Sequence, residues 1–131
     1  MASIDDPAVR ALLDAPNHAV ISTLNADGSV HSTVVWQELV DGTVGINSAL
    51  GRRWPANLQR DPRITVVVYA RDNPYEYVEI QGTATGTTVG ADAQIDRLAN
   101  KFTGAASFDT PADEERISFA VRPTRLNHYR G

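Results

Sequence analysis

The residues best suited to chemistry lie in one stretch near the middle of the chain, residues 51–63. Arg52 and Arg53 stand side by side where a short helix is expected to begin. Pro55 supports that placement, because proline is tolerated in the first helical turn, where its missing N–H has no partner. The unpaired N–H groups and positive dipole end of a helix, joined by two guanidinium groups, suit a phosphate or carboxylate. The alternative is that both arginines are simply solvated.

Few other side chains offer acid–base or nucleophilic chemistry. The histidines, His18, His31 and His128, are scattered and lack the spacing of a metal site. His31 shares a strand face with Thr33 and Val35 by alternation, so it is either a site residue or a surface histidine. No nucleophile elbow, glycine-rich phosphate loop or cysteine is present. This pattern favours a protein in which a bound cofactor supplies the chemistry and no side chain acts as nucleophile.

Aromatic residues surround the arginine stretch in the sequence. They are either core and subunit contacts or the walls of a slot for a flat ring system. The five are Trp36, Trp54, Tyr69, Tyr75 and Tyr77.

Composition sets the class of protein. The 131 residues predict a single domain, 1–131, with one core. Sixteen acidic residues against twelve basic ones give a net charge of −4, which argues against non-specific nucleic-acid binding. Lys101 is the only lysine, so the remaining basic residues are arginines. No apolar run is long enough to cross a bilayer, so we expect a cytoplasmic protein with no membrane partner.

The elements around the arginine stretch predict a mainly β fold. Helices are expected at 6–14, from the arginines to Asp61, and at 90–102, and strands at 18–24, 29–40, 43–48, 63–69, 75–89 and 116–129. The first three strands should form a meander, and the apolar run 63–69 should be buried on both faces. Gly82 and Gly86 should bend the fifth strand, and Pro123 the sixth. These features predict a six-stranded antiparallel split β-barrel with short helices at the connections.

Several blocks of sequence, in this order, resemble the actinobacterial flavin/deazaflavin oxidoreductases of the pyridoxamine 5′-phosphate oxidase-like split-barrel superfamily. The blocks are the Val-Val-Trp strand, Gly-Arg-Arg-x-x-x-Asn-Leu-x-Arg-Asp-Pro-Arg at 51–63, Asn-Pro-Tyr-Glu-Tyr-Val-Glu-Ile-Gln-Gly at 73–82, and the closing Arg-Ile-Ser-Phe-Ala-Val-Arg-Pro-Thr-Arg strand. The resemblance covers about Val9 to Arg125.

The resemblance implies a homodimer with a cofactor in each cleft between subunits. The cofactor would be the deazaflavin coenzyme F-420 or, in related branches, FMN, and the reaction would be hydride transfer with a small organic acceptor. The cofactor-binding positions implied by the family pattern are His31, Val34, Asn47, Ser48, Ala49, Arg52, Arg53, Trp54, Asn57, Tyr75 and Tyr77.

One position departs from the family pattern. Many relatives carry a lysine that contacts the anionic tail where this chain has Trp54. Tryptophan can pack on a ring but supplies no charge, and one charge-assisted contact is worth about 1.5–3 kcal/mol. Two other functions stay open beside an F-420-dependent reductase: an FMN oxidoreductase on the same barrel, and a carrier that binds the cofactor without turnover.

Overall fold

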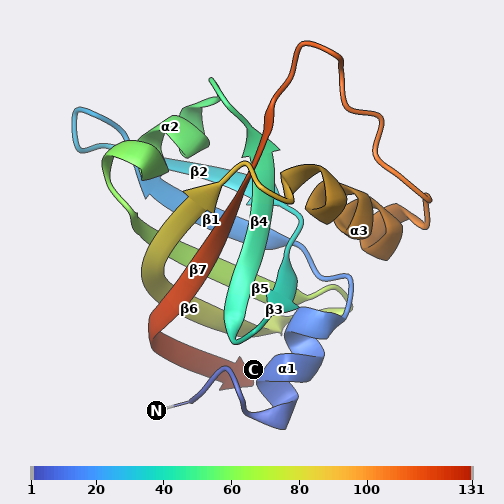
Figure 1. The fold of residues 1–131 in the computed structure, drawn as a ribbon. Helices are drawn as coiled ribbons and strands as arrows, with labels where there is room; N and C mark the ends of the chain where they lie inside the picture. The colour runs from blue at the N-terminus through green and yellow to red at the C-terminus, as the bar shows by residue number, and fades with distance from the viewer. Residues whose placement is uncertain (1, 131) are drawn as a thin grey trace.

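The computed structural model describes residues 2–130 and consists of strands with three short helices (Figure 1). The elements in chain order are α1 (Pro7–Asp14), β1 (Ala19–Leu24), β2 (Val30–Val35), β3 (Glu38–Val40), β4 (Thr43–Ala49), α2 (Arg53–Arg60), β5 (Arg63–Ala70), β6 (Asn73–Thr87), α3 (Ala91–Thr103) and β7 (Arg116–Arg130).

The described strands form one antiparallel sheet of seven strands in the order β2-β1-β5-β6-β7-β4-β3. The prediction of a mainly β, antiparallel fold is confirmed. The expected count of six strands is not, because the segment 29–40 forms two strands instead of one. β2 pairs with β1 and β3 pairs with β4, so these two strands end up on opposite edges of the sheet. The predicted meander is therefore wrong.

The break between β2 and β3 has a clear physical cause in Trp36 and Gln37. The Gln37 side chain is fully buried, and its amide nitrogen donates to the Leu13 and Asn17 carbonyls, each at 3.0 Å. The Trp36 ring stacks on Phe102 of α3, with centroids 5.6 Å apart. These contacts direct the chain away from β2, at one edge of the sheet, to β3 at the opposite edge. The two edge strands, β2 and β3, do not pair with each other, so the barrel is left open, or split, between them.

The longest strands, β6 and β7, bend sharply as the sheet curls (Figure 1). The register between them shifts at Gln81 and Gly82, where Pro123 and Arg125 flank one unpaired residue. A Cβ at Gly82 would lie 2.3 Å from the Arg122 carbonyl oxygen, so only glycine allows this approach. The predicted bends at Gly82 and Pro123 are confirmed.

The buried core lies on the concave side of the sheet. It includes Leu13 of α1, Ile21 of β1, Ile46 of β4 and Phe119 of β7. In β5, only alternate residues are buried, whereas Thr65 and Val67 are half-exposed on the convex side. The expectation that β5 is buried on both faces does not hold within one chain. The convex faces of β2, β1 and β5 are thus left uncovered by the chain's own elements.

Two observations on the described residues concern possible partners. No helix among residues 2–130 has the length and apolar character needed to cross a bilayer. No group of three or more His, Asp or Glu side chains in that range is arranged to hold a metal ion.

Candidate functional site

A cleft of about 610 Å³ lies where the barrel is split, between the edge strand β2 on one side and β4, α3 and the start of β7 on the other. The N-terminal end of α2 closes one end of it. The cleft is lined by His18, His31, Thr33, Val34, Val35, Trp36, Asn47, Ser48, Arg52, Arg53, Trp54, Ile95, Leu98, Phe108 and Arg116. Seven of the eleven residues expected at a cofactor site therefore line one cavity.

One end of the cleft is strongly cationic. Helix α2 begins at Arg53, with Arg52 in the extended conformation as its N-cap residue and no side chain capping the helix. Pro55 lies in the first turn and the helix ends before Asp61, as predicted. Arg116 enters the same end from β7. Three guanidinium groups and a helix N-terminus therefore face one region, which suits an anion.

Arg116 is one of the site residues that sequence reasoning missed. Only 4% of its side chain is exposed, although it carries a full charge. Its Nε donates to Asn47 Oδ1 at 3.0 Å, and its guanidinium group lies 5.2 Å from the centroid of the Phe108 ring. Burial lowers the pKa of Arg116, the Glu114 carboxylate opposes that shift and Arg52 adds to it. An arginine pKa lies so far above neutrality that the group stays charged.

Asn47 links the cationic end to α3. Its Nδ2 donates to the Ala91 carbonyl at 2.9 Å and to Gln94 Oε1 at 2.8 Å, while its Oδ1 accepts from Arg116. Every polar atom of this buried amide is thus engaged within the chain. Asn47 is therefore suited to fix the Arg116 guanidinium in position.

The other end of the cleft is aromatic. Trp36 stacks on Phe102 and meets the edge of Phe108, with centroids 5.6 and 6.3 Å apart. The His18 ring lies 5.2 Å from Phe102. Sequence reasoning left open whether Trp36 belongs to a core or to a slot for a flat ring. The structure places it on the wall of the cleft, and it adds His18 and Phe108, which carried no sequence signal.

Four residues expected at the cofactor site lie outside the cleft. Ala49 is buried in the core. Asn57 is buried and donates to Thr23 Oγ1 at 3.1 Å and Asn25 Oδ1 at 3.0 Å, which attaches α2 to the β1–β2 hairpin. Tyr75 is 73% exposed at the start of β6, and Tyr77 stacks on Tyr129 with centroids 4.6 Å apart. Trp54 lines the cleft but packs mainly on Phe119 in the core.

Lys101 lies next to the aromatic end of the cleft. Its Nζ donates to the Leu13 carbonyl at 2.7 Å and the Gln37 carbonyl at 2.8 Å. Burial lowers the pKa of Lys101 to about 8, although the carboxylates of Asp14 and Glu38 act in the opposite direction. A neutral amine keeps two N–H donors, so deprotonation preserves both contacts.

This lowered pKa predicts an unusual response of stability to pH. The unfolded chain binds a proton at Lys101 up to its ordinary pKa of 10.5, whereas the folded chain releases it near pH 8. Stability due to this group therefore rises as the pH rises from 8 towards 10.5. After discounting for partial exposure, we expect a gain of about 1 kcal/mol in the unfolding free energy over that range, relative to Lys101→Met. Urea denaturation of both proteins at pH 7.5 and at pH 10 measures it, and parallel pH curves would contradict the assignment.

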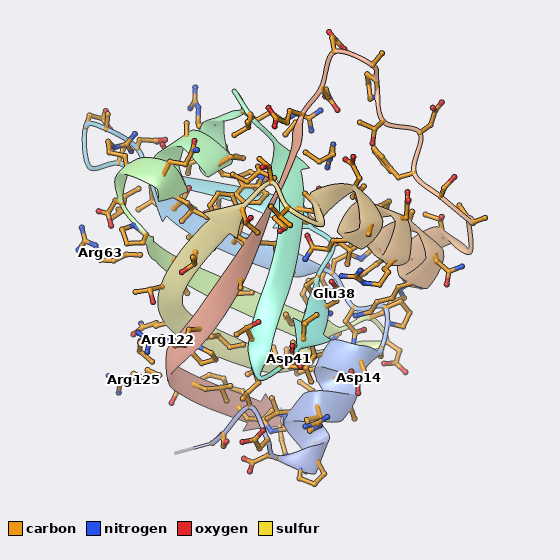
Figure 2. The ribbon with its side chains drawn as sticks, viewed as in Figure 1. Asp14, Glu38, Asp41, Arg63, Arg122 and Arg125 are labelled. Atoms are coloured by element: carbon orange, nitrogen blue, oxygen red, sulfur yellow. The ribbon has the colours of Figure 1, made fainter. Side chains whose placement is uncertain are left out.

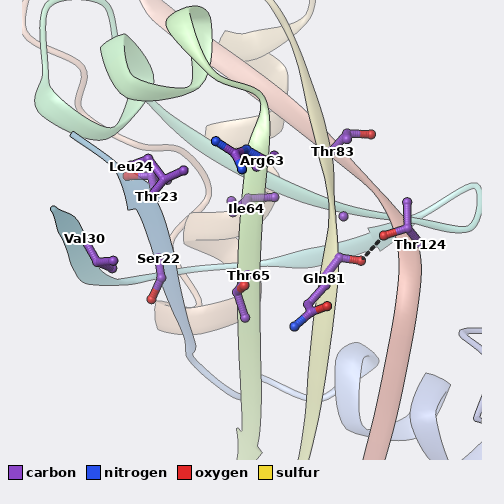
Figure 3. A pocket seen from close by; sticks show the side chains of 11 residues that line it. Ser22, Thr23, Leu24, Val30, Arg63, Ile64, Thr65, Gln81, Thr83 and Thr124 are labelled. Carbon is purple, nitrogen blue, oxygen red and sulfur yellow. Dashed lines mark hydrogen bonds between the residues drawn. The ribbon is translucent and has the colours of Figure 1, made fainter. Parts of the chain in front are cut away.

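A second hollow, of about 390 Å³, lies on the convex face of β1, β5 and β6 (Figure 3). Its one charged residue, Arg63, is held by Asp61 at 2.7 Å, and this contact lowers the pKa of Asp61 to about 2. Thr124 Oγ1 closes one side by donating to the Gln81 carbonyl at 3.0 Å. Figure 2 shows Arg63, Arg122 and Arg125 on this outer side of the molecule, away from α1 and α3. This hollow, in which the charge of Arg63 is balanced by Asp61, is separate from the cationic cleft.

The fold agrees with comparisons to known proteins. The family model "Pyridoxamine 5′-phosphate oxidase" matches residues 5–130. A search of the curated proteins gives no match. Among solved structures, an F420 reductase is similar, with 24% identity, a TM-score of 0.80, and 90% of this chain and 94% of that chain covered.

Two further structures share the fold. A conserved hypothetical protein from Mycobacterium tuberculosis has 16% identity and a TM-score of 0.75, with 95% and 84% of the two chains covered. The General Stress Protein 26 from Bacillus anthracis has 14% identity and a TM-score of 0.69, with 91% and 88% covered. Because the family model spans almost every described residue, this chain belongs to the pyridoxamine 5′-phosphate oxidase family.

Proposed function

We propose that the protein is an oxidoreductase that holds reduced coenzyme F-420 in the split of the barrel and passes a hydride to a small organic acceptor. The observation that carries this proposal is the convergence of Arg52, Arg53 and Arg116 at one end of the cleft. FMN is the alternative cofactor, since its phosphate needs the same cations. A carrier that binds either molecule without turnover remains the third possibility.

The residues present fit such a cofactor. The cleft volume of about 610 Å³ lies within the range typical of small-molecule sites, roughly 300–1,000 Å³. Its cationic end suits a phosphate, and its Trp36 and Phe108 end suits the edge of a flat ring. Arg116 also supplies the positive charge that family relatives place at the position of Trp54.

Within this proposal, the chain positions the cofactor and excludes water. When bound, a reduced deazaflavin or flavin supplies the hydride chemistry. The arginines would hold the phosphate, and Asn47 would keep Arg116 in place. Strand β2 would form one wall of the cleft, with His31 and Thr33 pointing into the split. We assign no catalytic side chain, in agreement with the sequence.

We propose that the working form is a homodimer that packs through the convex face of β2, β1 and β5. Val34, Val20 and Val67 lie side by side across these strands by the pairing register. Val34 is 59% exposed, and Val30 on the same face is 63% exposed. Contiguous exposed apolar residues of this kind typically mark an interaction surface. Val34 also lines the cleft, so a copy packed on this face would reach its mouth.

The choice of cofactor is tested by titrating the purified protein with F-420 and with FMN side by side, following fluorescence. We expect the Arg52→Ala plus Arg53→Ala double variant to bind the preferred cofactor about tenfold or more weakly, with a smaller difference at high salt. Arg122→Ala removes the same kind of charge from an exposed site on β7 and serves as the control. Equal affinity of the double variant and wild type would reject the cationic end as the phosphate site. Release of FMN from denatured yellow protein would favour FMN.

A further inference from the structure

Glu114 lies between two of the cleft's arginines. One carboxylate oxygen, Oε1, accepts from Arg52 Nη2, and the other, Oε2, accepts from Arg116 Nη1 at 3.3 Å. Its side chain is only 21% exposed, so it is largely shielded from solvent beside the two arginines. A carboxylate that bridges two guanidinium groups makes the contacts that two phosphate oxygens would make. Glu114 and a bound phosphate would therefore compete for the same donors.

The charges of the site support competition. Arg52, Arg53 and Arg116 bring three positive charges, and Glu114 cancels one of them. An anion that binds these arginines must therefore take the place of the Glu114 carboxylate. A phosphate has two non-ester oxygens for this exchange, so it can replace both contacts at once.

The position of Glu114 in the chain also allows its side chain to be displaced. Glu114 belongs to the irregular connection 104–115, between α3 and β7, which extends away from the barrel (Figure 1). The backbone is held on either side of Glu114: the Glu115 carbonyl accepts from the Leu50 N–H at 2.9 Å, and the Phe108 N–H donates to Asp96 Oδ1 at 2.8 Å. Residues 111–113 between these points are exposed. The Glu114 side chain can therefore rotate away from the arginines while Phe108 and Glu115 keep their backbone contacts.

We propose that Glu114 is an internal competitor for the anion site, displaced by the phosphate of the bound molecule, and that it makes the site selective for phosphate over monocarboxylate. This inference rests on the proposed function, because it assigns the arginines to a phosphate. Glu114 is accordingly a specificity-determining residue and not a catalytic one.

The test compares wild type, Glu114→Gln and Glu115→Gln at constant ionic strength. The probes are inorganic phosphate and acetate, and the readout is ligand-induced stabilisation against thermal unfolding. We expect Glu114→Gln to bind phosphate about tenfold more tightly than wild type, and to gain measurable acetate binding. Glu115→Gln makes the same change in net charge at an exposed neighbouring position, and it should behave as wild type.

A second variant separates competition from damage to the fold. Glu114→Asp keeps the charge, but its shorter side chain cannot span both arginines, so phosphate affinity should rise by less than in Glu114→Gln. Unchanged or weaker phosphate binding by Glu114→Gln would overturn the proposal and make Glu114 a positioning partner of the arginines. An equal gain in Glu115→Gln would overturn it too, because long-range charge would then explain the effect.

The same measurements distinguish this inference from the proposed function. Tighter phosphate binding by Glu114→Gln, in a protein that binds neither F-420 nor FMN, would support the inference and refute the function. Cofactor binding by wild type with no effect of Glu114→Gln would refute the inference alone. Absence of phosphate binding in all three proteins would refute the inference alone, because the titration with F-420 and FMN tests the function.

Discussion

Replacing Arg116 with methionine should lower the affinity for the bound cofactor about 10- to 100-fold, because the variant loses a charge-assisted contact in a mostly buried setting. Methionine fills a similar space beside Phe108 without the charge. The unfolding free energy should change by no more than about 2 kcal/mol, since relief of a buried charge offsets the lost contact to Asn47. Equilibrium titration with F-420 and FMN, beside urea denaturation, gives both quantities.

Two comparisons make this prediction specific. Arg116→Lys keeps the charge but loses the planar guanidinium group, so its affinity should fall between those of wild type and Arg116→Met. Arg125→Ala removes an exposed arginine on the same strand, outside the cleft, and should bind like wild type. If Arg116→Met binds as tightly as Arg125→Ala, Arg116 has no part in anion binding.

Replacing Val67 with arginine should convert the proposed dimer to a monomer and lower cofactor affinity at least tenfold. Val67 lies at the centre of the convex face, between Val20 on one side and Glu79 on the other. A positive charge there would be buried against its own copy across a two-fold axis, which is costly. Within one chain, the introduced guanidinium group can pair with Glu79, so the monomer should stay folded.

Sedimentation equilibrium and circular dichroism check the outcome for Val67→Arg. Thr85→Arg introduces the same charge at an exposed position of β6 and should leave the oligomeric state unchanged. A wild type that is monomeric at micromolar concentration would contradict the dimer. A Val67→Arg monomer with undiminished cofactor affinity would show that each cleft is complete within one chain.

Local sequence signals predicted most of the elements correctly. Pro7 and Pro55 mark the first turns of α1 and α2, and Asp61-Pro62 ends α2, because proline restricts the backbone around it. Asp41 and Gly42 both have positive φ in the tight turn between β3 and β4, as the Asp-Gly pair indicates. Such signals act within a few residues, so they can be identified without the fold.

The break at Trp36 and Gln37 could not be predicted in this way. The segment Val30 to Val40 is rich in β-forming residues, and no proline or glycine interrupts it. The chain leaves the first edge because Gln37 finds carbonyl partners in and after α1, and Trp36 finds Phe102, which is 66 positions away. Tertiary contacts of this kind override local propensity.

The candidate site shows the same difference between residues marked by local sequence signals and residues brought in by tertiary contacts. Arg52 and Arg53 were identified because a helix start and paired cations are adjacent in the sequence. Arg116 was missed because its partners are distant in the sequence. Asn47 lies 69 positions earlier, and no local sequence pattern indicates that the two residues are paired. Glu114 was missed as well, since its contact with Arg52 spans 62 positions. These residues come together only when the chain is folded.

A crystal structure of the protein with its preferred cofactor, F-420 or FMN, tests the central claim most directly. We expect the phosphate to lie within hydrogen-bond distance of Arg52, Arg53 and Arg116, with the ring along β2 in a cleft completed by a second copy. A phosphate bound elsewhere, for example beside Arg63 in the convex hollow, with those three guanidinium groups left in solvent, would contradict it.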